Sequence, residues 1–186
     1  MKNILFFGNS LTAGFGLRNA EMESFPALIG QKINAARLNY KVINAGLSGD
    51  TSIGGLNRIS YWISQHVDVF VLELGINDII QGIRPQTTLV NLQAITDKVK
   101  TKYPGVKIVL MGMEIPPFIP VPFAAQFREI YRELADKNQM AFVPFFLEGV
   151  AGKPHLNLPD LLHPNAEGYK VIVEKVWPVI KALLVD

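Results

Sequence analysis

The stretch Asn3-Ile4-Leu5-Phe6-Phe7-Gly8-Asn9-Ser10-Leu11-Thr12 decides the fold of this chain of 186 residues. It begins as a short, continuous apolar run and ends in a glycine, an amide, a serine and a threonine. Continuous apolar runs are typical of strands whose parallel sheet is covered by helices on both faces. The stretch therefore predicts a buried first strand over 3–8 and, directly after it, a turn that carries Ser10.

Further runs of this kind follow, and longer amphipathic stretches separate them. Strands are predicted over 3–8, 41–45, 67–74, 107–112 and 141–145. Helices are predicted over 24–36, 55–65, 86–102, 123–138 and 165–185. This alternation requires a parallel, doubly wound sheet with right-handed crossovers. Since no linker or repeat divides the chain, we expect one α/β domain over residues 1–186.

Composition excludes several classes of function. Hydrophobic residues make up 49% of the chain and charged residues 18%, which is typical of a well-packed globular protein. The net charge is only +2 and Lys and Arg do not cluster, so no nucleic acid partner is expected. The absence of Cys excludes disulfides, thiol catalysis and cysteine-ligated metals.

The sequence also bears on the compartment. No segment reaches transmembrane length, so no integral membrane segment is expected. The apolar residues 4–7 are too few for the core of a signal peptide, and no small-residue cleavage site follows them. We expect either a cytoplasmic protein or the mature form of an exported one. Nothing in the pattern predicts the oligomeric state.

The chemically suggestive residues all follow predicted strands. Ser10 follows the first strand, the loop 46–51 the second, the segment 75–78 the third, and the segment 160–163 lies in the long loop after the fifth. In an open parallel sheet, ligands bind beyond the carboxyl ends of the strands. These segments are therefore expected to share one edge of the sheet.

Ser10 and the pair Asp160–His163 can form a catalytic group. A serine hydroxyl is a poor nucleophile unless an imidazole takes its proton. Asp160 can hold the Nδ1–H of His163 and leave Nε2 to face Ser10. Each pattern alone has a plainer interpretation, because Ser10 can cap the helix that follows it and Asp160 can cap the turn before Pro164. Only their conjunction indicates nucleophilic catalysis.

Acyl transfer also needs hydrogen-bond donors where negative charge develops. The loop 44–51 offers backbone N–H groups, with Gly49 permitting close approach, and Asn77 offers a neutral amide. The plainer interpretation is ordinary turn chemistry, since Gly, Asn and Asp dominate turns. A phosphate-binding loop over 44–51 is disfavoured, because the loop lacks both the G-K-[ST] ending and the G-x-G-x-x-G spacing.

Four segments together resemble, in the right order, the four blocks of the SGNH (GDSL-type) hydrolase family. They are Gly8-Asn9-Ser10-Leu11, the glycine of Ser48-Gly49-Asp50, Gly75-x-Asn77-Asp78 and Asp160-x-x-His163. The neighbouring residues, such as Glu73-Leu74-Gly75 and His163-Pro164-Asn165, are similar to the small bacterial arylesterases and to the thioesterase/lysophospholipase branch. The resemblance spans nearly the whole chain.

This resemblance implies a three-layer α/β/α, flavodoxin-like fold with a five-stranded parallel sheet. It also implies a serine esterase that needs no cofactor and no metal. By position, Ser10 is the nucleophile, His163 the general base and then acid, and Asp160 the orienting carboxylate. The backbone N–H of Ser10, the N–H of Gly49 and the side chain of Asn77 would form the oxyanion hole.

The segment 114–123 is apolar, yet its four prolines do not suit a helix or a central strand. It is either a rigid loop packed on the edge of the sheet or one side of an acyl-binding groove. The groove predicts a small acyl ester or lipid-like substrate, namely short to medium acyl or aryl esters, with thioesters and lysophospholipids included. The predicted substrate-binding residues are Ile76, Ile79, Ile115, Phe118 and Ile119.

Two alternatives stay open at this point. A carbohydrate O-deacetylase on the same scaffold would need polar and sugar-stacking side chains around the groove, and the Pro/Phe/Ile segment argues against them. A flavodoxin-like module that binds a flavin, a nucleotide or a phosphate would leave Ser10 and His163 without a joint role.

Asn9 departs from the family pattern, which usually has Asp at this position. The amide is nearly the same size and can still accept a hydrogen bond, so Asn9→Asp is expected to keep kcat/KM within about tenfold, or about 1.4 kcal/mol of barrier. Hydrolysis of a p-nitrophenyl ester measures this. A much larger change in either direction would show that charge at position 9 affects the chemistry.

Overall fold

A five-stranded parallel sheet organises the computed structural model, which describes residues 1–115 and 122–185. The strand order is β2-β1-β3-β4-β5, and every neighbouring pair is parallel. The strands are β1 (Lys2–Gly8), β2 (Tyr40–Gly46), β3 (Val69–Glu73), β4 (Lys107–Met111) and β5 (Ala141–Val143). This order is that of flavodoxin-like sheets, so the predicted fold class is confirmed.

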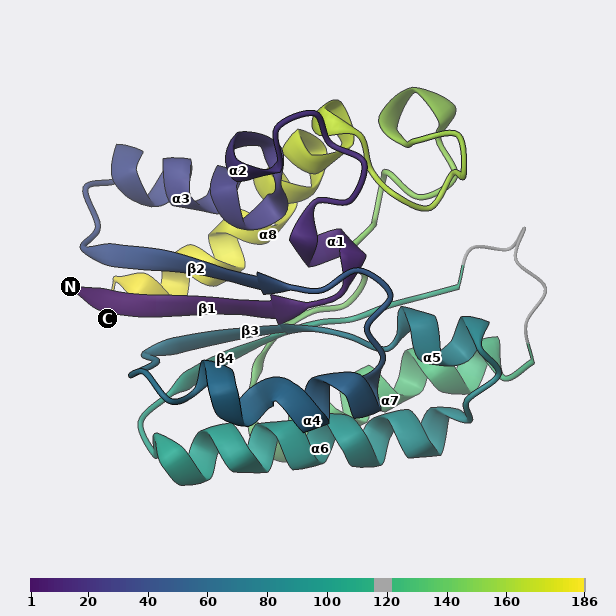
Figure 1. The fold of residues 1–186 in the computed structure, drawn as a ribbon, viewed down its shortest axis with the longest axis horizontal. Helices are drawn as coiled ribbons and strands as arrows, with labels where there is room; N and C mark the ends of the chain where they lie inside the picture. The colour runs from purple at the N-terminus through teal and green to yellow at the C-terminus, as the bar shows by residue number, and fades with distance from the viewer. Residues whose placement is uncertain (116–121, 186) are drawn as a thin grey trace.

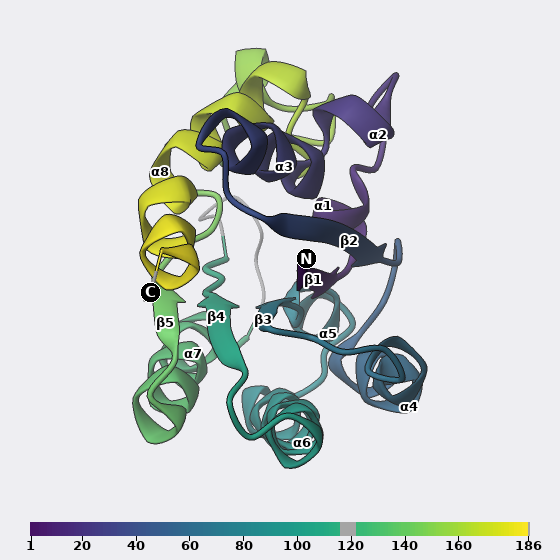
Figure 2. The same cartoon turned by 90° about the vertical axis from the view of Figure 1, so that its left-hand side faces the viewer.

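Helices cover both faces of the sheet and make three layers (Figures 1 and 2). On one face α3 (Phe25–Ala35) packs against α8 (Ala166–Leu184). On the other face α6 (Pro85–Lys102) lies between α4 (Ser52–Trp62) and α7 (Ala124–Asn138). The short helices are α1 (Ser10–Ala13), α2 (Ala20–Glu23), α5 (Ile76–Ile80) and the 3-10 helix η1 (Pro154–Leu156).

The centre of the core is β1, which lies between β2 and β3 and is covered on both sides. Ile4, Leu5, Phe6 and Phe7 have no exposed surface. Phe6 meets the ring of Phe25 edge-on at 5.1 Å, and Phe7 lies 5.8 Å from Phe70, measured between ring centroids. Full burial of such a side chain stabilises the fold by about 1.5–3 kcal/mol. This is why the run is apolar at every position and does not alternate.

The carboxyl ends of three neighbouring strands, β2, β1 and β3, are level. Gly8, the last residue of β1, pairs with Gly46 on one side and with Glu73 on the other. The loops that follow these three residues therefore start side by side at one edge of the sheet. Gly46 lets α1 approach β2 closely, because a Cβ there would lie 2.2 Å from the backbone nitrogen of Ala13.

The predicted long elements are all present, with ends that differ by three residues or fewer. The largest shift is in α4, which begins at Ser52 because Thr51 Oγ1 accepts from Gly54 N at 3.3 Å and caps the helix. β5 ends at Val143 because Pro144, the next residue, has no N–H for the ladder. The short helices α2, α5 and η1 were not predicted, because one turn is too short for an apolar period.

One further finding concerns membranes. Over residues 1–115 and 122–185, no helix combines the length and the apolar composition that crossing a bilayer requires.

Candidate active site

Ser10 is the first residue of α1, at the level end of β1. Its side chain is buried, with 6% of the residue exposed, and its Oγ lies 2.9 Å from Nε2 of His163. The helix cap is Asn9, whose Oδ1 accepts from Leu11 N at 2.9 Å. The capping interpretation of Ser10 is therefore wrong. Its hydroxyl lies in hydrogen-bond reach of the imidazole at 2.9 Å and of Asn9 Oδ1 at 3.4 Å.

Asp160 and His163 form a tight turn after β5. Asp160 Oδ2 lies 2.6 Å from His163 Nδ1, and Oδ1 accepts from the backbone N–H groups of Leu162 and His163, both at 2.9 Å. Leu161 sits in the left-handed region with φ of 59°, which costs about 1–3 kcal/mol for a residue with a Cβ. Asp160 thus does both things that the sequence allowed, since it caps the turn and binds the imidazole.

The electrostatics of this turn keep the carboxylate charged. Partial burial would raise the pKa of Asp160, but the hydrogen bonds from the backbone and side chain of His163 and from Leu162 N together lower it below its usual value. An ionised Asp160 fixes the proton of the neutral imidazole on Nδ1 and leaves Nε2 as an acceptor for the Ser10 hydroxyl. It also stabilises the imidazolium once that forms.

A buried tyrosine joins the two ends of the chain at this site. Tyr169, in the first turn of α8, donates its hydroxyl to the carbonyl of Leu11 at 2.8 Å. Leu158 N donates to His163 O at 2.8 Å, so the turn is also held from the loop before it. On the outer side the ring of Phe15 lies 4.8 Å from that of His163, between centroids. The imidazole is therefore fixed by contacts on several sides.

The predicted oxyanion donors lie on the loops after β1, β2 and β3. Asn77, at the start of α5, donates one amide hydrogen to the carbonyl of Asp50 at 2.8 Å and keeps a second one free of that bond. Gly49 has φ of 80°, and a Cβ on it would meet open space. A glycine suits this position because of its left-handed conformation, and the close approach of a ligand to its N–H stays a prediction.

A buried carboxylate from the third sequence block, for which no role was predicted, joins two of these loops. Asp78 is fully buried and accepts from the N–H and the hydroxyl of Ser52 and from Thr88 Oγ1. Asn91 Nδ2 in turn donates to Ser52 Oγ at 2.9 Å. The bond from Ser52 N, 2.8 Å long, fixes the start of α4 on α5. In this way the loop that carries Gly49 is held against the helix that carries Asn77.

Glu73 lies under the turn that carries Ser10 and is fully buried. It accepts hydrogen bonds from Asn9 N at 3.2 Å, from Asn9 Nδ2 at 2.9 Å and from Thr12 Oγ1 at 2.8 Å. Burial raises the pKa of Glu73 to about 8, although these bonds oppose the rise. An aspartate at position 9 would face Glu73 with a carboxylate oxygen where the amide N–H now lies, so the pair would have to keep a proton.

The predicted substrate-binding residues differ in where they lie. Ile76 and Ile79 were predicted to bind substrate, but they are only 2% exposed and pack in the core, so they offer almost no surface to a ligand. Their helix α5 turns its apolar side inward and exposes Ile80 instead. Ile115 is half-buried beside the core. Phe118 and Ile119 lie outside the described residues.

Other large apolar side chains are exposed on the loops around Ser10. They are Phe15 after α1, Leu47 after β2 and Ile80 at the end of α5, with 49%, 52% and 44% exposed. Each belongs to the connection that follows one of the three level strand ends. They were not predicted, because a single apolar residue in a turn has no period that shows which way its side chain faces.

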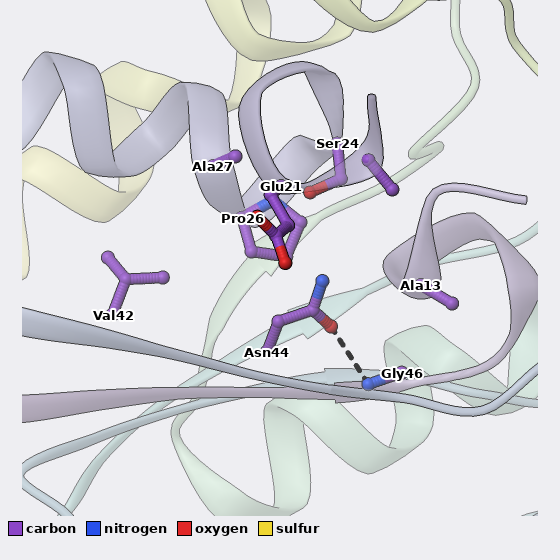
Figure 3. Close-up of a pocket in the computed structure, with 9 residues that line it drawn as sticks. Ala13, Glu21, Ser24, Pro26, Ala27, Val42, Asn44 and Gly46 are labelled. Carbon is purple, nitrogen blue, oxygen red and sulfur yellow. Dashed lines mark hydrogen bonds between the residues drawn. The ribbon is translucent and has the colours of Figure 1, made fainter. Parts of the chain in front are cut away.

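A separate pocket of about 490 Å³ lies on the outer side of β2 (Figure 3). Asn44 rises from β2 into it, facing Glu21, while its Nδ2 donates to Thr12 O and its Oδ1 accepts from Gly46 N. The bond to Thr12 O fastens α1 to β2, so the amide has a structural use. None of the predicted site residues lines this pocket, whose lining is Ala13, Ala20, Glu21, Ser24, Pro26, Ala27, Val42, Asn44 and Gly46.

Comparison with known families agrees with this geometry. Residues 6–171 match the GDSL-like Lipase/Acylhydrolase family. The chain belongs to this family. It is therefore an enzyme of an ester-hydrolysing family, and the resemblance drawn from its four sequence blocks is confirmed.

Similar proteins place this GDSL-like acylhydrolase among bacterial esterases. It is 33% identical to the esterase TesA of Pseudomonas aeruginosa, over 98% of this chain and 90% of that one, and the crystal structure of TesA matches with a TM-score of 0.92 over 98% of this chain and all of that one. It is 34% identical to the thioesterase 1/protease 1/lysophospholipase L1 of Escherichia coli, over 92% and 79%. The structure of the psychrotrophic esterase EstA from Pseudoalteromonas, inhibited by monoethylphosphonate, matches with a TM-score of 0.88 at 29% identity over both full lengths.

The pKa of Glu73 predicts how stability depends on pH. Because burial raises this pKa from 4.5 to about 8, the folded state holds more protons than the unfolded chain between those values. The free energy of unfolding is then expected to fall as pH rises through that window. Glu73→Gln removes the titrating carboxyl and should flatten the dependence, measured by urea unfolding at several pH values. The exposed Glu133→Gln is the control, and an unchanged slope in Glu73→Gln would contradict the assignment.

Proposed function

We propose that this acylhydrolase is a serine esterase that cleaves short to medium acyl or aryl esters through Ser10, His163 and Asp160. The observation that carries the proposal is the continuous contact from Ser10 Oγ to His163 Nε2, 2.9 Å, and from His163 Nδ1 to Asp160 Oδ2, 2.6 Å. Nucleophile, base and orienting carboxylate in hydrogen-bond reach are the arrangement that activates a serine.

In the acylation step, Nε2 of His163 takes the proton of Ser10 as Oγ attacks the ester carbonyl carbon. The carbonyl oxygen becomes negatively charged in the tetrahedral intermediate, and the N–H groups of Ser10 and Gly49 and the free amide hydrogen of Asn77 stabilise it. The imidazolium then gives its proton to the alcohol oxygen. The C–O bond breaks, the alcohol leaves, and the acyl group stays on Ser10.

In the deacylation step, water takes the place of the alcohol. His163 removes a proton from the water, whose oxygen attacks the acyl carbon, and the same donors stabilise the second tetrahedral intermediate. The proton returns to Ser10 Oγ as the acid leaves. Asp160 stays ionised throughout, in keeping with its lowered pKa.

The exposed apolar residues around Ser10 support an apolar substrate. Phe15 lies against the imidazole of His163, and Leu47 and Ile80 project from the two neighbouring loops. An alkyl or aryl group bound there buries apolar surface on both partners, worth about 0.8 kcal/mol for each CH₂ group. The side chains of Phe15, Leu47 and Ile80 themselves offer no hydrogen-bond donor or acceptor to a sugar, which disfavours the carbohydrate O-deacetylase.

A fluorophosphonate probe tests the role of Ser10. The parent protein is expected to be labelled at Ser10, because the activated hydroxyl attacks phosphorus as it would a carbonyl carbon. Ser10→Ala and His163→Ala should lose labelling and activity, while Ser64→Ala and His155→Ala, which change an exposed serine and an exposed histidine, should retain both. Labelling that survives Ser10→Ala, read by intact mass and peptide mapping, would refute the nucleophile.

A series of p-nitrophenyl esters from acetate to laurate tests the substrate class. Activity is expected to be highest for short to medium chains. Each CH₂ group that contacts the apolar side chains of Phe15, Leu47 and Ile80 adds binding energy, and further CH₂ groups extend beyond them and add none. Leu47→Ser should move the preference towards shorter chains, and Tyr61→Ser, an exposed apolar residue on α4, should not. Absence of hydrolysis at every chain length would rule the proposal out.

A further inference from the structure

Arg58 lies on α4, a helix that carries none of the predicted site residues. Its guanidinium lies at the carboxyl ends of β1 and β2, and only 19% of the side chain is exposed. Nε donates to Asp50 Oδ2 at 2.7 Å, Nη1 to Ala45 O at 2.8 Å and Nη2 to Gly8 O at 2.9 Å. All three guanidinium nitrogens are therefore engaged, each on a different segment.

Two of these contacts, those to Gly8 and Asp50, lie close to predicted oxyanion donors. Gly8 is two residues before Ser10, whose N–H is one donor. Asp50 follows Gly49, the second donor, and the carbonyl of Asp50 accepts from Asn77 Nδ2, the third, at 2.8 Å. The three donors come from three separate loops. Arg58 binds a residue at most two positions away from Ser10 and from Gly49, and it is linked to Asn77 through one further hydrogen bond, that to the Asp50 carbonyl.

We propose that Arg58 is a positioning residue that sets the geometry of the oxyanion hole. The inference rests on the proposed function, because it assigns no chemistry to Arg58 itself. The guanidinium fixes the end of β1 relative to the end of β2, and it fixes Asp50 relative to both. Asp50 then orients the Asn77 amide through its carbonyl. Arg58 thus acts through groups that touch the substrate and does not touch the substrate itself.

The shape of the arginine side chain is what this task requires. Its planar fork presents donors in fixed directions, and the plane lies 4.0 Å from the centre of the Phe7 ring, so its orientation is fixed too. A lysine has a single charged nitrogen and cannot reach Asp50 Oδ2, Ala45 O and Gly8 O in this geometry at once. Lysine keeps the charge and loses the geometry, which makes Arg58→Lys the informative change.

The carboxylate of Asp50 is buried against the start of α4, where Arg58 can fix its position. A Cβ on Gly54, in the first turn of α4, would lie 2.1 Å from Asp50 Oδ1, so the carboxylate lies directly on the helix start. Asp50 is 7% exposed, and burial raises its pKa while the bond to Arg58 opposes the rise. Arg58 therefore helps to keep a buried carboxylate charged and in place beside Gly49.

The test compares Arg58→Lys with the parent in kcat and KM, per active site counted by fluorophosphonate titration. If the lysine shifts the three oxyanion donors, stabilisation of the transition state is weakened while binding of the substrate is not. We therefore expect kcat to fall by about 10- to 100-fold and KM to stay within about threefold. The inhibition constant of an alkylboronic acid, which forms a tetrahedral adduct on serine, should rise by the same factor as kcat falls. Arg132→Lys is the matched control. Arg132 lies on α7 with its Cζ 5.7 Å from the centre of the Phe142 ring, and its replacement should change neither kcat nor the inhibition constant.

A purely structural role would lower the melting temperature or the titrated fraction and leave kcat per titrated site unchanged, which would overturn the inference. A rise in KM at unchanged kcat would also overturn it. If Arg58→Lys does not fold, Asp50→Asn removes the charged partner and keeps the carbonyl that binds Asn77, and full kcat in that variant would refute the positioning role. Ser10→Ala in the same assay separates the two proposals, since activity that survives it refutes the serine mechanism itself, whatever Arg58 does.

Discussion

The parallel pairing of β1 with β2 and β3 at the same level is the constraint on which the site depends. Because Gly8 pairs with both Gly46 and Glu73, three loops start at one edge within two strand spacings of each other. Ser10, Gly49 and Asn77 are far apart in sequence and reach one another only through this register. A shift by one residue would turn the alternate side chains of β1 to the opposite face and move the end of the strand away from its neighbours.

Register alone would leave these loops loosely held, and buried polar contacts remove that freedom. Arg58 joins the ends of β1 and β2, Asp78 holds the start of α4 on α5, and Tyr169 holds α1 on α8. Every one of these bonds connects segments that only the tertiary fold brings together. Because a buried polar group costs free energy unless it is paired, each bond penalises any arrangement that breaks it. The same contacts that satisfy buried groups therefore also orient the site.

Which parts of the fold and of the site could be predicted from the sequence depends on whether each part has a recognisable pattern of apolar residues. β1 and the long helices have an apolar pattern over many residues, so their places were predicted to within a few positions, and so was the meeting of Ser10 with the Asp160–His163 turn. Arg58 leaves no such signal, because a single charged residue on a helix usually faces water. Asp78 belongs to the third sequence block, but nothing in that block shows that its carboxylate is buried. Ile76 and Ile79 were misplaced because a one-turn helix has no period that shows which side faces inward.

Asn9 shows how a departure from the family pattern can suit its surroundings. Its side chain accepts from Leu11 N and donates to Glu73, and only an amide can do both without an added proton. A carboxylate in its place would meet a second buried carboxyl, and two such groups side by side cannot both ionise at low cost. With the amide, a single carboxyl remains beneath the turn that carries Ser10, and the three donors to that carboxyl hold the turn in shape. This turn thus keeps its geometry through Asn9 and Glu73 together, with one titrating carboxyl where an aspartate at position 9 would place two.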